Sequence, residues 1–309
     1  MIKVDLITGF LGSGKTTFLK RYAAYLTAHG QRIGILENDH GAVNVDMMFL
    51  HELEGENCGL DMVAGACDAD CHRRRFKTKL IAMGMSGYDR VLIEPSGVFD
   101  IDEFFDVLYE EPLDRWYEIG SVIAVVDADL EEDLSESAEY LLASQAANAG
   151  AVLLSKAGLC GAKEADATVE HIDRALRHIG CSRSVRGAVI AKDWDSLTDS
   201  DFERIRDSGY VAENYVKRGT TDDSGFSSLY YLNKKFTADA LRSKAEAVFK
   251  DPSCGRVFRV KGFVREGEGW IELNATRQSV SVRRVSAGQE IIIVIGEELN
   301  ASAVAEYFE

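Results

Sequence analysis

One glycine-rich segment constrains the fold more than any other feature, the run Gly-Phe-Leu-Gly-Ser-Gly-Lys-Thr-Thr at residues 9–17. It follows an apolar, strand-like run at residues 4–8 and opens a helical pattern at residues 15–28. Backbone N–H groups of such a turn at a helix N-terminus bind phosphate oxygens, the lysine reaches the outer phosphates, and the next threonine hydroxyl ligates magnesium. The segment therefore predicts a P-loop for a nucleoside triphosphate. We expect these residues to bind the nucleotide: Gly9, Gly12, Ser13, Gly14, Lys15, Thr16 and Thr17.

A P-loop also needs a carboxylate that helps to hold magnesium, commonly at the end of a neighbouring strand. Glu94 ends the strand-like run at residues 90–94 and is followed by Pro-Ser-Gly. We expect Glu94 to act with Thr16 at the magnesium, and the Gly97 N–H to sense the γ-phosphate. Asp127, which ends another apolar run, is the weaker alternative to Glu94. The expected catalytic set is Lys15, Glu94 and Gly97.

The first half of the chain alternates apolar runs with amphipathic stretches, the order that a doubly wound α/β fold requires. Most of the runs are continuously apolar, which suits strands of a mostly parallel sheet buried on both faces. The expected strands are residues 4–8, 32–37, 61–64, 90–94, 121–127, 151–155 and 185–190. The expected helices are residues 15–28, 71–85, 102–108, 138–147 and 163–178. We assign residues 1–190 to a P-loop nucleotide-binding domain.

A second, smaller domain is expected after a change in composition. Residues 191–225 are mostly polar and contain acidic residues and glycines throughout, so we assign them to a linker. Beyond them, closely spaced strand patterns are separated by glycine-containing turns, which favours an antiparallel sheet. With helices at 237–250 and 301–308, residues 226–309 are expected to form an α+β domain.

The composition restricts the classes of partner. The 309 residues carry a formal net charge of −16, which argues against nucleic acid as a partner. The first residues lack the pattern of a secretory leader, and no apolar run approaches the roughly 20 residues of a membrane helix. Six cysteines are too few for a disulfide framework. These features predict a soluble, cytoplasmic protein without a membrane partner.

Several motifs together resemble the CobW family of metal-linked GTPases. They are the P-loop, the Glu-Asn-Asp-His-Gly turn at residues 37–41, the Glu-Pro-Ser-Gly run at 94–97, and the strand at 255–263. The resemblance covers nearly the whole chain and implies a slow GTPase that uses magnesium. It implies that hydrolysis is coupled to delivery of a metal, or of a metal-containing cofactor such as a cobalamin, to a client metalloprotein or corrinoid protein. It leaves the metal, the client and formation of a homo-oligomer open.

The chain departs from the family at the base-binding motif. The family carries Asn/Thr-Lys-x-Asp after a strand, and the aspartate accepts hydrogen bonds from guanine. The matching residues here are Ser155, Lys156, Ala157 and Gly158, so the carboxylate is missing. By resemblance, Ser155 and Lys156 contact the base. Without the carboxylate we expect GTP to be preferred over ATP by less than a guanine-specific site achieves, and ATP remains an alternative nucleotide.

A second departure lies in the family's metal motif, Gly-Cys-x-Cys-Cys. Here Cys67 is kept, and a second cysteine, Cys71, follows four residues later beside His72. Cysteines four apart share one face of a helix, and thiolates with imidazole suit zinc or cobalt(II). The alternative is that both cysteines are small buried residues. The candidate donors to this metal are Cys67, Cys71, His72, Cys58, Glu37, Asp39 and His40, with Asp68 and Asp70 nearby.

Two other functions remain open on the sequence. The P-loop could serve an ATP-dependent small-molecule kinase or ligase, although no convincing acceptor base is evident. It could instead gate a scaffold whose metal site is vestigial. Metal content and nucleotide-dependent metal affinity separate these functions from metal delivery.

Overall fold

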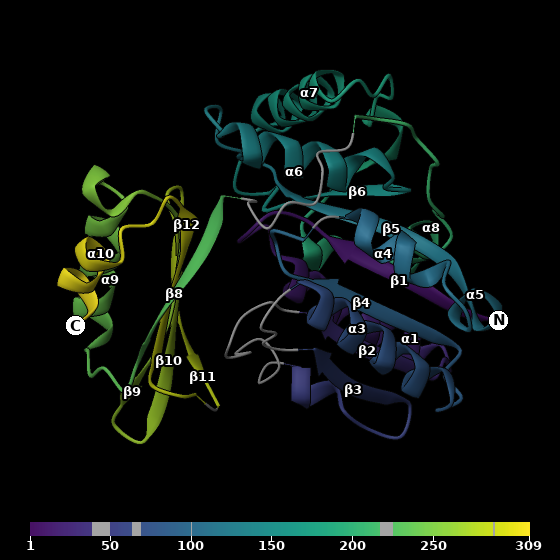
Figure 1. The fold of residues 1–309 in the computed structure, drawn as a ribbon, viewed down its shortest axis with the longest axis horizontal. Coiled ribbons are helices and arrows are strands. Elements are labelled where there is room, and N and C mark those ends of the chain that lie inside the picture. The colour runs from purple at the N-terminus through teal and green to yellow at the C-terminus, as the bar shows by residue number, and fades with distance from the viewer. Residues whose placement is uncertain (39–49, 64–68, 100, 217–224, 287) are drawn as a thin grey trace. The chain divides into compact units, whose positions relative to one another are not determined.

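The fold comes from a computed structural model that describes residues 1–38, 50–63, 69–99, 101–216, 225–286 and 288–309. The chain forms two compact units, Met1–Thr220 and Thr221–Glu309 (Figure 1). In the described part of the chain, no helix has both the length and the apolar character to cross a membrane.

The first unit is a doubly wound α/β fold around a seven-stranded parallel sheet with the order β3-β2-β4-β1-β5-β6-β7. Its strands are β1 (Ile2–Thr8), β2 (Ile33–Asn38), β3 (Cys58–Val63), β4 (Arg90–Pro95), β5 (Tyr117–Asp127), β6 (Ala151–Ser155) and β7 (Val189–Ala191). Its main helices are α1 (Lys15–Ala28), α3 (Ala69–Gly84), α4 (Ile101–Leu108), α5 (Leu113–Trp116), α6 (Glu136–Ala147), α7 (Ala162–His178) and α8 (Asp199–Arg206). The strand that leads into the phosphate loop is thus central.

Each face of this sheet buries its own hydrophobic core. On one face α1 packs through Phe18 and Tyr22, joined by Phe202 of α8. The other core combines side chains of α3, α4, α6 and α7, including Phe76 and Phe104. Helices on both faces explain why every residue of β2, β4 and β6 is buried.

Residues 191–216, within the range expected to be a linker, are packed into the first unit. They contain a 3-10 turn (η3, Trp194–Ser196) and α8, whose Phe202 and Ile205 are buried in the α1 core. Helix α8 begins at a capping box, in which Thr198 and Asp201 exchange side-chain and backbone hydrogen bonds. This stretch therefore adds a helix to the face of the sheet that α1 covers.

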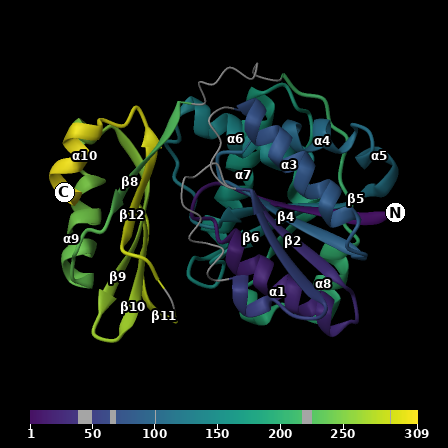
Figure 2. The same cartoon turned by 60° about the horizontal axis from the view of Figure 1, so that its bottom comes forward.

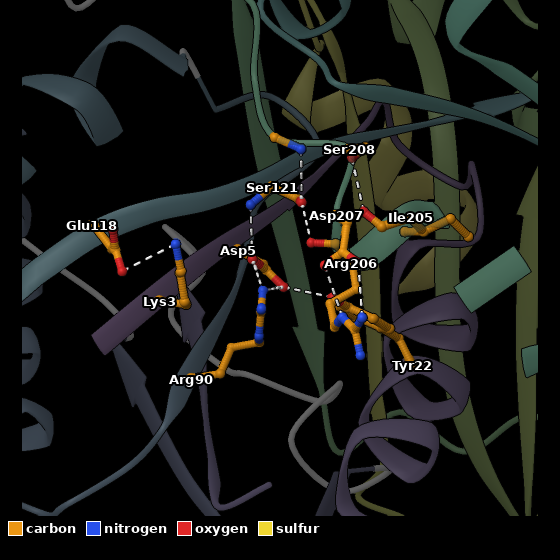
Figure 3. Close-up of polar contacts among 11 residues, drawn as sticks. Lys3, Asp5, Tyr22, Arg90, Glu118, Ser121, Ile205, Arg206, Asp207 and Ser208 are labelled. Carbon is orange, nitrogen blue, oxygen red and sulfur yellow. Dashed lines mark hydrogen bonds and ion pairs between the residues drawn. The ribbon is translucent and has the colours of Figure 1, made fainter. Parts of the chain in front are cut away.

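A buried polar network ties this segment to the centre of the sheet (Figure 3). Asp5 of β1 is fully buried and accepts hydrogen bonds from Arg90 of β4 at 2.5 and 2.6 Å. It also accepts from Tyr22 Oη at 2.7 Å and from the Ser121 N–H of β5 at 2.8 Å. Ser121 Oγ in turn donates to the Arg206 carbonyl at 2.8 Å. The network joins three strands, the phosphate-loop helix and the end of α8.

The second unit is an α+β fold with a five-stranded antiparallel sheet in the order β11-β10-β9-β12-β8. Its elements are β8 (Phe226–Leu232), α9 (Ala238–Val248), β9 (Arg256–Glu266), β10 (Gly269–Thr276), β11 (Val280–Val285), β12 (Ile291–Glu297) and α10 (Ala301–Phe308). Both helices lie on the same face of this sheet (Figure 2), where Leu241, Val248 and Phe308 are buried with strand residues such as Val260.

Candidate functional site

The phosphate loop connects β1 to α1 at the carboxyl edge of the parallel sheet. Three of its glycines have positive φ, 146° at Gly9, 77° at Gly12 and 99° at Gly14, which caps α1. The Lys15 ammonium donates to the carbonyls of Gly9 at 3.0 Å and Phe10 at 3.5 Å, so it lies over the loop. The loop thus combines a helix N-terminus, strand-end position and lysine in the arrangement that binds phosphates.

Thr16 and Glu94 meet beside this loop. The Thr16 hydroxyl donates to Glu94 Oε1 at 2.8 Å, and Glu94 is only 4% exposed. A hydroxyl and a carboxylate are oxygen ligands of the kind that magnesium prefers. The residues present therefore fit a magnesium ion held beside a nucleotide.

Asp127, the weaker alternative to Glu94, has a different partner. Its carboxylate forms an ion pair with the Lys156 ammonium, and it also accepts from the Asp129 N–H at 3.2 Å. The pair links the ends of β5 and β6, whereas Glu94 is hydrogen-bonded to Thr16. The geometry favours Glu94 over Asp127 as the carboxylate for magnesium.

The turn that carries Gly97 lies directly against the phosphate loop. A Cβ added to Gly97 would come within 2.7 Å of the Leu11 nitrogen and 2.9 Å of the Leu11 Cα, so only glycine fits. From the other side, buried Gln145 of α6 donates to the carbonyls of Gly97 at 3.3 Å and Phe99 at 3.4 Å. A movement of this turn would therefore change its contacts with both the phosphate loop and α6.

The residues expected to contact the base follow β6. Ser155 is 1% exposed, and its hydroxyl has no hydrogen-bond partner among the described residues. Its Cβ would lie 3.6 Å from a Cβ on Gly14, so this turn adjoins the phosphate loop. Lys156 has a left-handed φ of 57°, and Leu159 N–H closes the turn on its carbonyl at 2.9 Å. The phosphate loop and the turn after β6 therefore lie next to each other.

Two residues of this site were not expected from the sequence, Asp193 and Trp194. They follow β7, and the Trp194 Nε1 lies 3.7 Å from the position of a Gly14 Cβ. The Asp193 carboxylate accepts from the Gly158 N–H at 2.8 Å. A signal for them did exist, because loops after the strands of a parallel sheet gather at its carboxyl edge.

Glu37, Cys71 and His72 are the candidate metal donors nearest this edge in the described chain. Glu37 lies on β2 opposite Glu94 in the strand register and is 4% exposed. Cys71 is in the first turn of α3 and half-buried. His72 is fully buried, with Nδ1 3.7 Å from Glu103 Oε1 of α4, so it lies in the packing between two helices.

Cys58 is separated from these donors. It begins β3 and pairs in register with Ile33 at the start of β2, so it lies at the amino edge of the sheet. Five residue steps of about 3.3 Å place it roughly 16 Å from the other end of the strand. Burial raises the pKa of the Cys58 thiol to about 11, with a smaller contribution from Glu54. The structure therefore does not bring Cys58 to Cys71, and the thiol resists the deprotonation that metal binding needs.

Four other candidate donors lie outside the described residues, namely Asp39, His40, Cys67 and Asp68. Among the residues that are described, no three His, Cys, Asp or Glu side chains come together as a metal-binding group. The described part of the chain thus contributes single donors at the sheet edge and not a complete metal centre.

Comparison with known proteins agrees with the phosphate-loop architecture. The family model described as CobW/HypB/UreG, nucleotide-binding domain, matches residues 3–185. Over 170 residues the chain is 29% identical to the zinc chaperone YjiA of Escherichia coli, covering 53% of this chain and 52% of that protein. Over 157 residues it is 27% identical to the zinc chaperone YeiR of the same organism, covering 50% and 47%.

A third relative is matched over more of the chain. The zinc-regulated GTPase metalloprotein activator 1 of Dictyostelium discoideum is 25% identical over 309 residues, covering 85% of this chain and 62% of that protein. The matches thus span about half the length of the two bacterial relatives and under two thirds of this one. The family model matches more than half of the 309 residues, from β1, before the phosphate loop, to residue 185, between α7 and β7. On that match, the chain belongs to the CobW/HypB/UreG family.

Proposed function

We propose that this chain hydrolyses GTP with magnesium and couples hydrolysis to the handling of a transition metal, zinc first, for a client metalloprotein. The observation that carries the nucleotide half is the Thr16 to Glu94 hydrogen bond of 2.8 Å beside a complete phosphate loop. The metal half is supported by the three relatives, two named zinc chaperones and one a zinc-regulated GTPase.

The site residues have distinct roles in this proposal. The loop N–H groups and Lys15 bind the phosphates, and bound magnesium supplies charge neutralisation of the β- and γ-phosphates. Thr16 and Glu94 hold that magnesium. Gly97 N–H senses the γ-phosphate, because its turn lies against Leu11 of the loop.

The cargo metal is proposed to bind near the same edge. Cys67 and Cys71 would be the thiolate donors, with Glu37 as the neighbouring carboxylate. Glu37 is the register partner of Glu94 on the adjacent strand, so it lies next to the residue proposed to hold magnesium. A metal here would contact segments that change when the γ-phosphate leaves, and its affinity would depend on the nucleotide.

The test measures both halves on the same protein. Hydrolysis of GTP is measured with magnesium, with and without zinc, and zinc affinity is measured in the presence of GDP and of a non-hydrolysable GTP analogue. By linkage, a zinc ion that binds the triphosphate form more tightly must strengthen triphosphate binding by the same factor. Lys15→Ala serves as the control, because it removes the side-chain cation of the loop and should abolish hydrolysis.

The outcomes divide the competing functions. Equal zinc affinity in both nucleotide states would remove the metal half and leave a nucleotide-gated scaffold. Hydrolysis by Lys15→Ala at the wild-type rate would refute the nucleotide half. Phosphate transfer to an added small molecule, with no release to water, would favour a kinase.

A further inference from the structure

A carboxylate from a neighbouring loop fills the space beside the residue where the family's base-binding aspartate is missing. The Gly158 N–H donates to Asp193 Oδ1 at 2.8 Å. A Cβ built on Gly158 would lie 1.9 Å from Asp193 Oδ2 and 2.6 Å from its Cγ. A side-chain carbon lies about 1.5 Å from the carbon to which it is bonded. The Asp193 carboxylate therefore occupies the volume into which a side chain at position 158 would extend.

We propose that Asp193 reads the base of the nucleotide, accepting hydrogen bonds from N1–H and the exocyclic amino group of guanine. The proposal rests on the proposed nucleotide function and names its specificity residue. The motif spacing does not identify this residue, because Asp193 comes from the loop after β7 and not from the motif after β6. The carboxylate that Gly158 lacks is supplied from 35 residues further along the chain.

The loop that carries Asp193 is held against the phosphate loop. Trp194 follows it, packs on Phe18 of α1 with ring centroids 5.5 Å apart, and places Nε1 3.7 Å from the Gly14 Cβ position. The Asp193 carbonyl accepts from the Ser196 N–H at 2.9 Å and from Ser196 Oγ at 2.8 Å. These contacts fix the backbone of Asp193, so its carboxylate is positioned before a base arrives.

The chemistry of a carboxylate selects guanine over adenine. An ionised carboxylate only accepts hydrogen bonds. Guanine offers two adjacent donors, N1–H and the 2-amino group, whereas N1 of adenine is itself an acceptor. Adenine would therefore leave the carboxylate desolvated opposite a lone pair, the situation in which polar sites discriminate strongly. With Asp193 in place, we expect a strong preference for GTP, in place of the weak one that Gly158 predicts.

The closing experiment replaces Asp193 and reads base preference by competition against a fluorescent GTP analogue with magnesium. Loss of two charge-assisted hydrogen bonds in Asp193→Ala should lower the ratio of GTP to ATP affinity about a hundredfold. In Asp193→Asn the amide oxygen can accept from N1–H while the amide nitrogen donates to a carbonyl at position 2. This variant should lose GTP and gain xanthosine triphosphate, which carries that carbonyl.

Asp195 gives a matched control in the same loop. Its carboxylate is exposed and pairs with Arg21 on α1, so Asp195→Ala removes the same charge without touching Gly158. Asp195→Ala should keep the wild-type preference. A pure capping role for Asp193 would give a different pattern, because asparagine can also accept from the Gly158 N–H and would leave all three affinities unchanged.

A reciprocal variant tests the substitution of one carboxylate for the other. Gly158→Asp alone should collide with Asp193, but Gly158→Asp combined with Asp193→Ala has room for the side chain and should restore the preference for GTP. Unchanged GTP, ATP and xanthosine triphosphate affinities in Asp193→Asn would overturn the proposal while leaving the nucleotide function intact. Wild-type protein that binds no triphosphate would instead refute the proposed function itself.

Discussion

Glu37 and Glu94 are register partners on the neighbouring parallel strands β2 and β4, and each residue is only 4% exposed. Their surroundings differ, since Glu94 accepts a hydrogen bond from Thr16 whereas Glu37 lies on the strand towards β3. We propose that the two carboxylates serve two different cations, Glu94 the magnesium beside the phosphate loop and Glu37 the cargo metal.

Glu94→Gln and Glu37→Gln should separate those two roles. Glu94→Gln should raise the magnesium concentration needed for half-maximal GTP hydrolysis by about 10- to 100-fold, the usual effect of disturbing a metal's supporting ligands. Glu37→Gln should weaken zinc affinity by more than it changes the magnesium requirement. Magnesium titrations of hydrolysis and zinc titrations with a competing chelator measure the two effects. The reverse pattern would exchange the assignments.

The cysteines of the metal motif can be tested with cobalt(II) as a spectroscopic probe. Cobalt(II) bound by thiolates should show a charge-transfer absorption, and Cys67→Ser with Cys71→Ser should remove it. Cys58→Ser is the matched control, because that thiol lies at the opposite edge of the sheet and should leave the spectrum unchanged. If the double variant kept its cobalt affinity, these two cysteines would be structural residues and not ligands.

The strands and the phosphate loop were predictable because their signals are local. A mostly apolar run before Gly9 and a helical period after Lys15 are properties of adjacent residues, and both elements are observed there. The strand expected at residues 185–190 is observed only from Val189, because Asp173 of α7 accepts from the Val185 N–H at 2.8 Å and holds the preceding turn. Such a long-range contact leaves no local pattern.

The residues around Asp193 show that the candidate site, too, depends on long-range contacts that leave no local sequence pattern. Their polar composition indicated a linker, and the capping signal of Thr198 and Asp201 before α8 was the available evidence for a packed helix. That Asp193 lies against Gly158 depends on how β6 and β7 pair in the sheet. A missing residue in a motif can therefore be compensated at a position that sequence spacing cannot identify.

The Cys58 thiol makes a prediction about stability at alkaline pH. Burial raises its pKa from 9.0 to about 11, so the folded chain binds this proton more tightly than the unfolded chain. The resulting stability is fully present below pH 9 and is lost as the pH rises towards 11. At pH 10 the loss should be about 1 kcal/mol.

Comparison with Cys58→Ala isolates this thiol from the other groups that titrate at high pH. The difference in unfolding free energy between wild type and Cys58→Ala, measured by urea denaturation, should shrink between pH 8 and pH 10. A constant difference would mean that the native thiol ionises as readily as the unfolded one.

The buried pair of Asp5 and Arg90 should behave differently when one or both partners are removed (Figure 3). Arg90→Met leaves the Asp5 carboxylate buried with only Tyr22 and the Ser121 N–H as donors, which should cost about 3–5 kcal/mol of unfolding free energy at pH 8. Asp5→Leu combined with Arg90→Met removes both charges, and its cost should be smaller than that of Arg90→Met alone. Urea denaturation of the two variants and wild type measures this.

The pH dependence of the unfolding free energy of Arg90→Met is a second test of the pair formed by Asp5 and Arg90. Burial raises the pKa of Asp5, and Arg90 is the largest influence that opposes this rise. Without Arg90 the pKa of Asp5 should rise further above its unfolded value, so the folded state gains stability by keeping the proton. That contribution is complete below the unfolded pKa and is lost as the pH rises through the folded one. The destabilisation by Arg90→Met should therefore be smaller at pH 5 than at pH 8, whereas the double variant, which lacks Asp5, should not be less destabilised at pH 5. An Arg90→Met effect that is equal at both pH values would mean that water or a rearranged side chain compensates the Asp5 charge.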